Sequence, residues 1–156
     1  MRTLALLLPV LLACPGPGAD GPALHFDRSP ETAAAELPFS DAVRVGELLF
    51  VSGQLGVRPG TTELVPGGIE AETRQCLENI RAILERNGSG LERVVKCTAF
   101  LADMDEWARM NAVYRTYFGA ALPARSALGV GGGLAFDARI ELECIAAVGM
   151  GKRPTR

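Results

Sequence analysis

The residue types best suited to chemistry lie near the end of the chain, in Pro123-Ala124-Arg125-Ser126 and in the segment that follows. Arg125 is expected in a short turn led by Pro123. Glu141 and Glu143 are two residues apart, which puts both carboxylates on one face of a strand. A guanidinium can bind a planar carboxylate through two parallel hydrogen bonds, and a nearby carboxylate can position or deprotonate a water. The pattern predicts a site that holds a small carboxylate and activates water beside it.

These residues also have an ordinary structural interpretation. Arg125 could be a surface arginine or could pair with Glu141 or Glu143, and the carboxylates could simply be solvated. The single histidine, His25, disfavours a multi-histidine metal site and a Ser-His-Asp or Cys-His relay. The glycine-rich stretch 129–133 lies between two predicted strands, so it predicts a loop rather than a phosphate-binding motif. The residues alone therefore leave both interpretations open.

The composition is that of a single globular domain. The chain has 156 residues, of which 48% are hydrophobic and 22% are charged, and its formal net charge is -2. It shows no basic run or stripe, which a nucleic-acid-binding surface would need. We therefore expect no nucleic-acid partner.

The first residues predict export. Residues 1–13 form a signal peptide in this interpretation, because the positive charge of Arg2 precedes an apolar run over 4–12 that is too short to span a bilayer. The alternative is a cytoplasmic protein with a chance apolar start.

Residues 11–14, Leu-Leu-Ala-Cys, resemble the lipobox of a bacterial lipoprotein, in which Cys14 would be lipidated. Ordinary signal cleavage within 13–19 is the alternative. Residues 14–23 are rich in proline and glycine and predict a flexible tether. The protein is thus expected in the periplasm or tethered to a membrane through Cys14.

Residues 24–150 predict one domain, followed by a short tail at 151–156. Hydrophobic periodicity predicts two helices and six strands, with a loop or a single helical turn at 29–37. The helices are expected at 69–86 and 104–118, and the strands at 24–26, 42–45, 48–52, 93–101, 127–130 and 139–148. This order predicts an α+β fold, in which both helices cover one face of a mostly antiparallel sheet and the other face is wet or packs on a partner.

Three cysteines remain in the predicted domain, Cys76, Cys97 and Cys144, and each lies among apolar neighbours. An odd number argues against a full disulfide framework. The pattern favours three buried free thiols that behave as small hydrophobic side chains. Export would permit a disulfide, but the spacing does not demand one.

From Pro38 to Val148 the chain resembles the RidA family, also called the YjgF/UK114 or reactive intermediate deaminase family. Six motifs carry the resemblance in the family's order and spacing: Pro-Phe-Ser-Asp-Ala-Val at 38–43, Phe-Val-Ser-Gly-Gln at 50–54, Gln-Cys-Leu-Glu-Asn-Ile at 75–80, Met-Asn-Ala-Val-Tyr at 110–114, Pro-Ala-Arg-Ser at 123–126 and Ile-Glu-Leu-Glu at 140–143. The resemblance implies a chorismate-mutase-like α+β subunit, a homotrimer, and clefts between subunits.

The family's best-known activity is the hydrolysis of 2-imino or enamine acids, such as 2-iminobutanoate and 2-iminopropanoate, to 2-oxo acids and ammonia. The resemblance implies that Arg125 binds the substrate carboxylate, that Glu141 positions the water, and that Gly53 and Asn111 lie near the pocket. No cofactor or metal is called for, because an iminium carbon is already electrophilic. The expected partners are a small 2-imino or 2-oxo acid and further copies of the chain.

Two pocket positions depart from the family pattern. Phe39 stands where the archetypes carry tyrosine, and Ala127 stands where they usually carry cysteine or threonine, so the predicted pocket is more apolar. The segment between Arg125 and Glu141 is also one residue longer. These changes favour the second hypothesis, a non-catalytic trimeric module that binds small carboxylates through the same arginine. A ribonuclease is the weakest hypothesis, given the acidic charge balance and the single histidine.

Overall fold

The computed structural model describes residues 21–120 and 122–149. The predicted signal peptide, the lipobox with Cys14, most of the tether and the tail at 151–156 lie outside these residues. Within the described part of the chain, no helix combines the length and the apolar character needed to cross a membrane.

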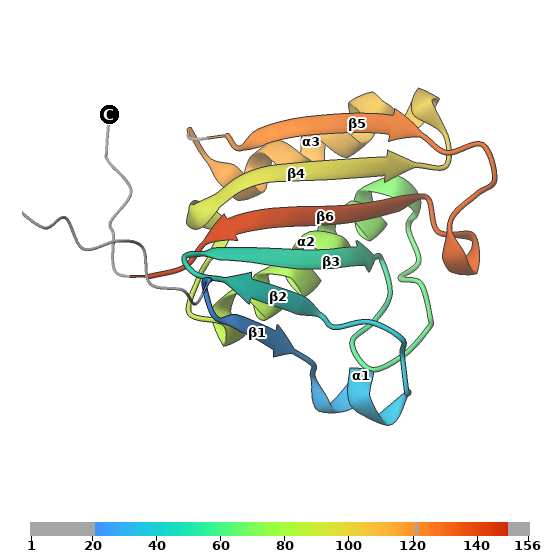
Figure 1. Ribbon diagram of the computed structural model, residues 1–156. Coiled ribbons are helices and arrows are strands. Elements are labelled where there is room, and N and C mark those ends of the chain that lie inside the picture. The colour runs from blue at the N-terminus through green and yellow to red at the C-terminus, as the bar shows by residue number, and fades with distance from the viewer. Residues whose placement is uncertain (1–20, 121, 150–156) are drawn as a thin grey trace, which may run out of the picture.

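Six strands form one sheet in the order β1-β2-β3-β6-β4-β5 (Figure 1). Their bounds are β1 Leu24–Asp27, β2 Ala42–Val45, β3 Leu48–Leu55, β4 Val94–Leu101, β5 Ala124–Gly129 and β6 Ile140–Ala147. All neighbouring strands are antiparallel except β4 and β5, which are parallel and are joined by a helical crossover. The last strand, β6, lies in the middle of the sheet, between β3 and β4.

Two long helices, α2 (Gly68–Arg86) and α3 (Trp107–Phe118), cover the same face of the sheet (Figure 1). The segment at 29–37 contains a short helix, α1 (Pro30–Ala34), in which the Ser29 hydroxyl accepts a hydrogen bond from the Thr32 amide. Three short 3-10 turns complete the elements: η1 (Leu91–Arg93), η2 (Met104–Glu106) and η3 (Ala135–Asp137). The predicted α+β fold, a mostly antiparallel sheet with two helices on one face, is confirmed.

The core lies between the sheet and these helices. Alternate residues of β6 are buried, because successive side chains of a strand point to opposite faces. In α2 the buried residues recur every three or four positions, as an amphipathic helix requires. The opposite face of the sheet is uncovered, and it exposes large apolar side chains such as Phe26, Leu48 and Phe50. We call it the open face.

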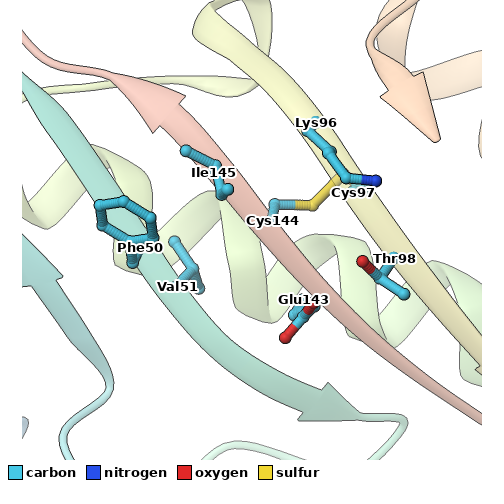
Figure 2. A pocket seen from close by; sticks show the side chains of 8 residues that line it. All are labelled: Phe50, Val51, Lys96, Cys97, Thr98, Glu143, Cys144 and Ile145. Carbon is cyan, nitrogen blue, oxygen red and sulfur yellow. A yellow bond between two sulfur atoms is a disulfide. The ribbon is translucent and has the colours of Figure 1, made fainter. Parts of the chain in front are cut away.

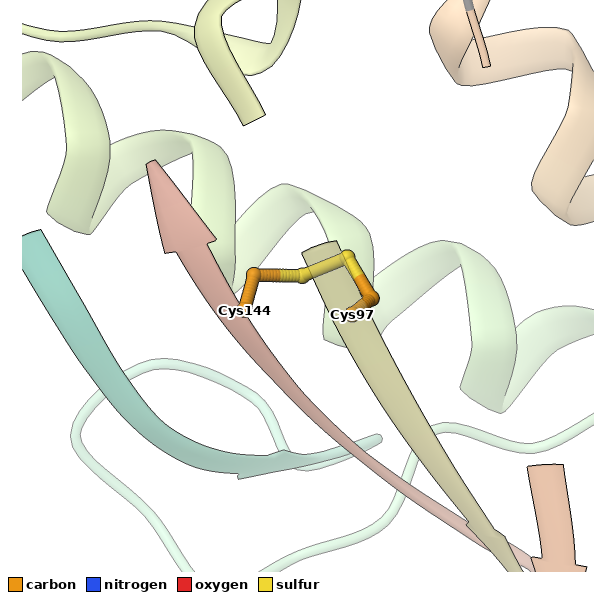
Figure 3. The surroundings of a disulfide bond; sticks show 2 residues. All are labelled: Cys97 and Cys144. Carbon is orange, nitrogen blue, oxygen red and sulfur yellow. A yellow bond between two sulfur atoms is a disulfide. The ribbon is translucent and has the colours of Figure 1, made fainter. Parts of the chain in front are cut away.

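The structure corrects the prediction of three free thiols. All three cysteines are buried, but Cys97 and Cys144 form a disulfide, and only Cys76 is free among the described residues (Figure 3). Cys97 and Cys144 lie directly opposite each other on the antiparallel strands β4 and β6, with their Cα atoms 4.1 Å apart. This strand register brings the two sulfur atoms together. It cannot be inferred from residues that are 47 positions apart in the sequence.

Removing this disulfide is expected to destabilise the fold substantially. The bond closes a loop spanning 47 residues. The loss of loop-closure entropy from the unfolded chain then corresponds to about 4 kcal/mol. Urea unfolding should show a lower free energy of unfolding for the Cys97→Ala/Cys144→Ala protein than for the oxidised wild type. Reductant should lower the wild-type midpoint and leave that of the double variant unchanged; equal midpoints for the two oxidised proteins would contradict this expectation.

Candidate functional site

Glu141 lies on the open face of the sheet, near the start of β6. Its neighbours Ile140 and Leu142 are buried against the helices, so strand alternation directs Glu141 to the other side. Its carboxylate fills the space above Gly53, because a Cβ atom on Gly53 would overlap Oε1 of Glu141. Gly53 lies where the pairing of β3 with β6 is interrupted, between Val51 and Gln54. The irregularity and the absent side chain together make a recess for the carboxylate.

The surroundings of Glu141 favour its protonated form. Burial raises the pKa of Glu141, and the negative charge of Glu143 raises this pKa further. Glu143 is exposed on the same face of β6. A carboxylate with a raised pKa accepts a proton more readily than an ordinary glutamate does, and this suits it to activate a water.

Phe39 lies at the same end of β3. The Ser52 hydroxyl donates a hydrogen bond of 2.6 Å to the carbonyl of Ser40, so the segment that carries Phe39 runs beside the strand next to Gly53. Phe39 is 49% exposed. We refer to Phe39, Gly53 and Glu141 as the Glu141 cluster.

Arg125 lies on strand β5, which begins at Ala124, and not in a turn as predicted. It pairs with Cys97 of β4 and therefore faces the helices, as Cys97 does. Its Nη1 atom donates to the sulfur of Met110 at 3.7 Å, and its Cζ atom lies 4.7 Å from the centre of the Tyr114 ring. A cation over an aromatic face is attracted by the ring, so α3 holds the guanidinium in place.

Asn111 and Ala127 lie on the same two elements as these contacts. Asn111 is half-buried and follows Met110 on α3, while Ala127 is half-buried two residues after Arg125 on β5. We refer to Asn111, Arg125 and Ala127 as the Arg125 cluster. Sequence reasoning did not assign a role to Tyr114, although it lies in the Met-Asn-Ala-Val-Tyr motif.

The Tyr114 side chain that contacts Arg125 is in its un-ionised form. Burial raises the pKa of Tyr114 to about 12, although the nearby charge of Arg125 acts in the opposite direction. Its buried hydroxyl has no hydrogen-bond partner among the described residues. The guanidinium likewise makes no ion pair within the described part of the chain, which removes the alternative of an Arg125 pair with Glu141 or Glu143.

The two clusters lie on opposite faces of the sheet. On β4, Arg125 pairs with Cys97 and Glu141 pairs with Phe100, and these two β4 residues are three positions apart. An odd separation turns the side chains to opposite faces. The expectation that Arg125 and the carboxylate lie at short range is therefore wrong within one chain.

A small pocket lies elsewhere on the open face, between β3, β6 and β4 (Figure 2). Its polar side chains come from Lys96, Thr98 and Glu143, and the Lys96 ammonium donates to the Ser126 hydroxyl at 3.1 Å. Glu143 is one of the two carboxylates that the sequence singled out, but no residue of the Glu141 cluster or the Arg125 cluster lines this pocket. Within 21–120 and 122–149, no group of three histidine, cysteine or acidic side chains is arranged to hold a metal ion.

Comparison with known proteins identifies the family to which the chain belongs. The family model described as endoribonuclease L-PSP matches residues 30–148. A RutC family protein of Pyrococcus horikoshii is 49% identical over 109 residues, which cover 70% of this chain and 86% of the relative. The 2-iminobutanoate/2-iminopropanoate deaminase of Mus musculus is 43% identical over 116 residues, which cover 74% and 85% of the two chains.

Solved structures of similar proteins support the same family. The yeast protein YEO7 superposes with a TM-score of 0.74 at 39% identity, covering 81% of this chain and 99% of the other. The yjgF gene product of E. coli superposes with a TM-score of 0.66 at 37% identity, covering 71% and 88%. The E. coli protein TdcF, solved with bound serine, has a TM-score of 0.67 at 33% identity, covering 72% and 89%. The chain belongs to the RidA family.

Proposed function

We propose that the protein hydrolyses 2-imino or enamine acids to 2-oxo acids and ammonia. Arg125 binds the substrate carboxylate, and Glu141 positions and deprotonates the water. One observation carries the proposal: the chain presents a guanidinium without a carboxylate partner among the described residues, and also a half-buried carboxylate whose pKa is raised. The guanidinium is suited to bind an anion, and the carboxylate is suited to accept a proton.

The chemistry needs little beyond these two groups. The water oxygen forms a bond to the carbon of the protonated imine while Glu141 accepts a proton from the water, and the π electron pair of the carbon–nitrogen bond moves onto the nitrogen. Glu141 then returns this proton to the nitrogen of the carbinolamine. As the carbon–nitrogen bond breaks and ammonia leaves, the carbinolamine hydroxyl becomes the carbonyl of the 2-oxo acid and its proton passes back to Glu141. Because the imine carbon is electrophilic at the start, positioning and acid–base help are sufficient.

The site is proposed to form between copies of the chain. Since the clusters lie on opposite faces of the sheet, one copy must supply the Arg125 cluster and a neighbour the Glu141 cluster. The open face supports such an assembly, because one row across β1, β2, β3 and β6 is formed by Phe26, Val43, Phe50 and Ile145. Exposed apolar surface of this kind is typical of an interface. We propose the homotrimer that the family resemblance implies; light scattering in solution tests it.

The relatives and the pocket composition indicate the class of substrate. The mouse, cattle and goat relatives are 2-iminobutanoate/2-iminopropanoate deaminases, and the TdcF structure holds serine, which carries a carboxylate beside an amine. Phe39 and Ala127 add no polar side-chain atoms to either cluster. We therefore propose 2-imino acids with apolar side chains as the preferred substrates.

A non-catalytic carboxylate-binding protein is the alternative that Phe39 and Ala127 favour. It would use the same arginine but would not accelerate hydrolysis. We do not extend the endoribonuclease description to this chain, because its net charge is -2 and phosphate binding depends on basic side chains.

We also propose that the protein is exported. The disulfide between Cys97 and Cys144 supports this location, because such bonds persist mainly in oxidising compartments. Residues 1–13 would be removed, and Cys14 would carry a lipid. Mass spectrometry of the protein purified from membranes tests this: a lipidated Cys14 supports the tether, and a full-length unmodified chain contradicts export.

A coupled assay tests the proposed reaction. An amino-acid oxidase generates 2-imino acids in situ, and the release of 2-oxo acid is followed with and without the purified protein. Acceleration above the spontaneous rate is the expected result. No acceleration with any of several side chains, together with saturable binding of 2-oxo acids, would favour the binding protein.

Gly53→Ala is expected to reduce turnover while the protein still folds. The added methyl group would overlap only the free end of the Glu141 side chain, so the carboxylate has to move and the backbone does not. A misplacement of about 1 Å can lower turnover by about 100-fold. The measurement is kcat together with the melting temperature.

Gly131→Ala is the matched control. A Cβ atom on Gly131 would meet nothing within 4 Å, so we expect this variant to keep both kcat and the melting temperature of the wild type. A Gly53→Ala protein with unchanged kcat would show that the recess above Gly53 does not matter.

A further inference from the structure

Three residues of α2 hold the strand ends that carry Gly53 and Glu141. Glu72, Cys76 and Asn79 are spaced by four and three positions, so they lie along one side of the helix. We call them the α2 row. The proposed reaction uses none of them, although Cys76 and Asn79 belong to one of the motifs that carry the family resemblance.

The first two members of the row bind the start of β6. Glu72 Oε2 accepts a hydrogen bond of 2.8 Å from the backbone amide of Arg139. The Cys76 thiol donates to the carbonyl of Ile140 at 3.9 Å. The Arg139 side chain is held in turn by Glu106, at 2.9 Å. The two residues that immediately precede the proposed catalytic carboxylate are therefore fixed to α2.

The third member binds the end of β3. The Asn79 side-chain amide donates to the carbonyls of Leu55 and Val57, at 3.1 Å each. Leu55 is the register partner of Glu141, and it lies two residues after Gly53. The same helix therefore holds both partners of the strand pair in which the carboxylate meets its recess.

Close packing leaves Glu72 little room to rearrange. Its side chain is 5% exposed, and its Cα, Cβ and Cγ atoms lie so near Gly56 that any side chain there would overlap them. Burial raises the pKa of Glu72, the amide and charge of Arg139 lower it, and the charge of Glu106 raises it. Because Glu72 cannot move to follow it, the backbone amide of Arg139 can bind Glu72 only while the start of β6 stays where it is.

We propose that Glu72 is a positioning residue for Glu141: it fixes the start of β6 so that the carboxylate lies in the recess above Gly53. Asn79 acts in the same way on β3. The catalytic effect of this arrangement rests on the proposed hydrolysis, but the position of Glu141 can be measured without any turnover.

The first measurement is the pKa of Glu141, by NMR titration of glutamate labelled with ¹³C in the full chain. In Glu72→Ala the carboxylate should leave its recess, so its pKa should fall toward the ordinary value. Glu72→Gln keeps an acceptor for the Arg139 amide and should preserve the raised pKa. If the loss of a negative charge alone were responsible, the two variants would behave alike, and that result would overturn the proposal.

Glu85→Ala is the matched control, because Glu85 is an exposed glutamate on the same helix. It should leave the pKa of Glu141 unchanged. A folded Glu72→Ala protein with the wild-type Glu141 titration would also overturn the proposal. If Glu72→Ala does not fold, Asn79→Leu provides the test at β3, since leucine is similar in size to asparagine, adds no charge and cannot donate either hydrogen bond. An unchanged Glu141 titration there is then the contradicting result.

Turnover provides the second measurement. Glu72→Ala should lower kcat by about 10- to 100-fold with little change in KM, and Glu72→Gln should restore most of it. A role in stability alone would lower the melting temperature and leave kcat unchanged. If the wild type itself shows no turnover, the proposed function fails, and the titration still decides whether Glu72 positions Glu141.

Discussion

Glu141→Gln is expected to lower kcat by about 10²- to 10⁴-fold, which is the usual contribution of a positioned general base. Glutamine keeps the size and the hydrogen-bonding shape of the side chain, so the recess above Gly53 stays filled. It cannot accept a proton from water. Binding of a 2-oxo acid should therefore change much less than turnover, and steady-state kinetics with a product-binding measurement separate the two.

The pH profile follows from the same carboxylate. The proposed mechanism needs Glu141 ionised, so turnover should fall as the pH decreases through its pKa. That pKa is raised by burial and by the charge of Glu143, so the fall should begin at a higher pH than for an ordinary glutamate. Glu143→Gln removes the nearby charge and should move the acid limb to lower pH.

Glu143→Gln is also the matched control for Glu141→Gln, because the two residues lie on the same face of β6 and Glu143 is exposed. It should retain kcat on the plateau of its pH profile. If Glu141→Gln kept full turnover with the wild-type acid limb, another group would have to be the base.

Arg125→Ala is expected to lower kcat/KM by about 100-fold to 10⁴-fold while the fold persists. Each hydrogen bond between a guanidinium and a carboxylate contributes about 1.5–3 kcal/mol, and a bidentate pair has two of them. Arg125 is half-buried on the edge strand β5, and its contacts are with Met110 and the Tyr114 ring. Its removal therefore leaves no buried charge unpaired within the described residues.

Two further variants make this measurement specific. Arg115→Ala removes an exposed arginine of α3 and should leave kcat/KM unchanged. Arg125→Lys keeps the positive charge but loses the planar fork, so it should recover only part of the activity. Full activity in Arg125→Ala, with an unchanged melting temperature, would remove the central residue of the proposed function.

Much of the fold could be predicted because it depends on local periodicity. The alternation of Ile140, Leu142 and Cys144 with Glu141 and Glu143 predicts one buried face of the last strand, and the structure has it. The three- and four-residue spacing in 69–86 predicts α2 within one residue of its observed start. Both patterns come from burying apolar side chains against one surface.

Long-range strand pairing could not be predicted in this way. The disulfide depends on the register of β4 against β6, and the separation of the two clusters depends on which β4 residue each pairs with. No feature of Cys97, Cys144 or Arg125 in the sequence encodes these registers. The family motifs identified candidate residues on both clusters, but not the face of the sheet on which each lies.

The central place of β6 has a consequence for the synthesis of the protein. The strand that joins β3 to β4 is the last one made, so when the ribosome has completed α3 and β5 the sheet is still two separate halves. Contacts between residues far apart in the chain form slowly, and exposed strand edges invite aggregation. A nascent chain without residues 140–147 has two additional exposed edges, at β3 and β4, and binding of a chaperone to either strand at that stage would delay folding until β6 emerges.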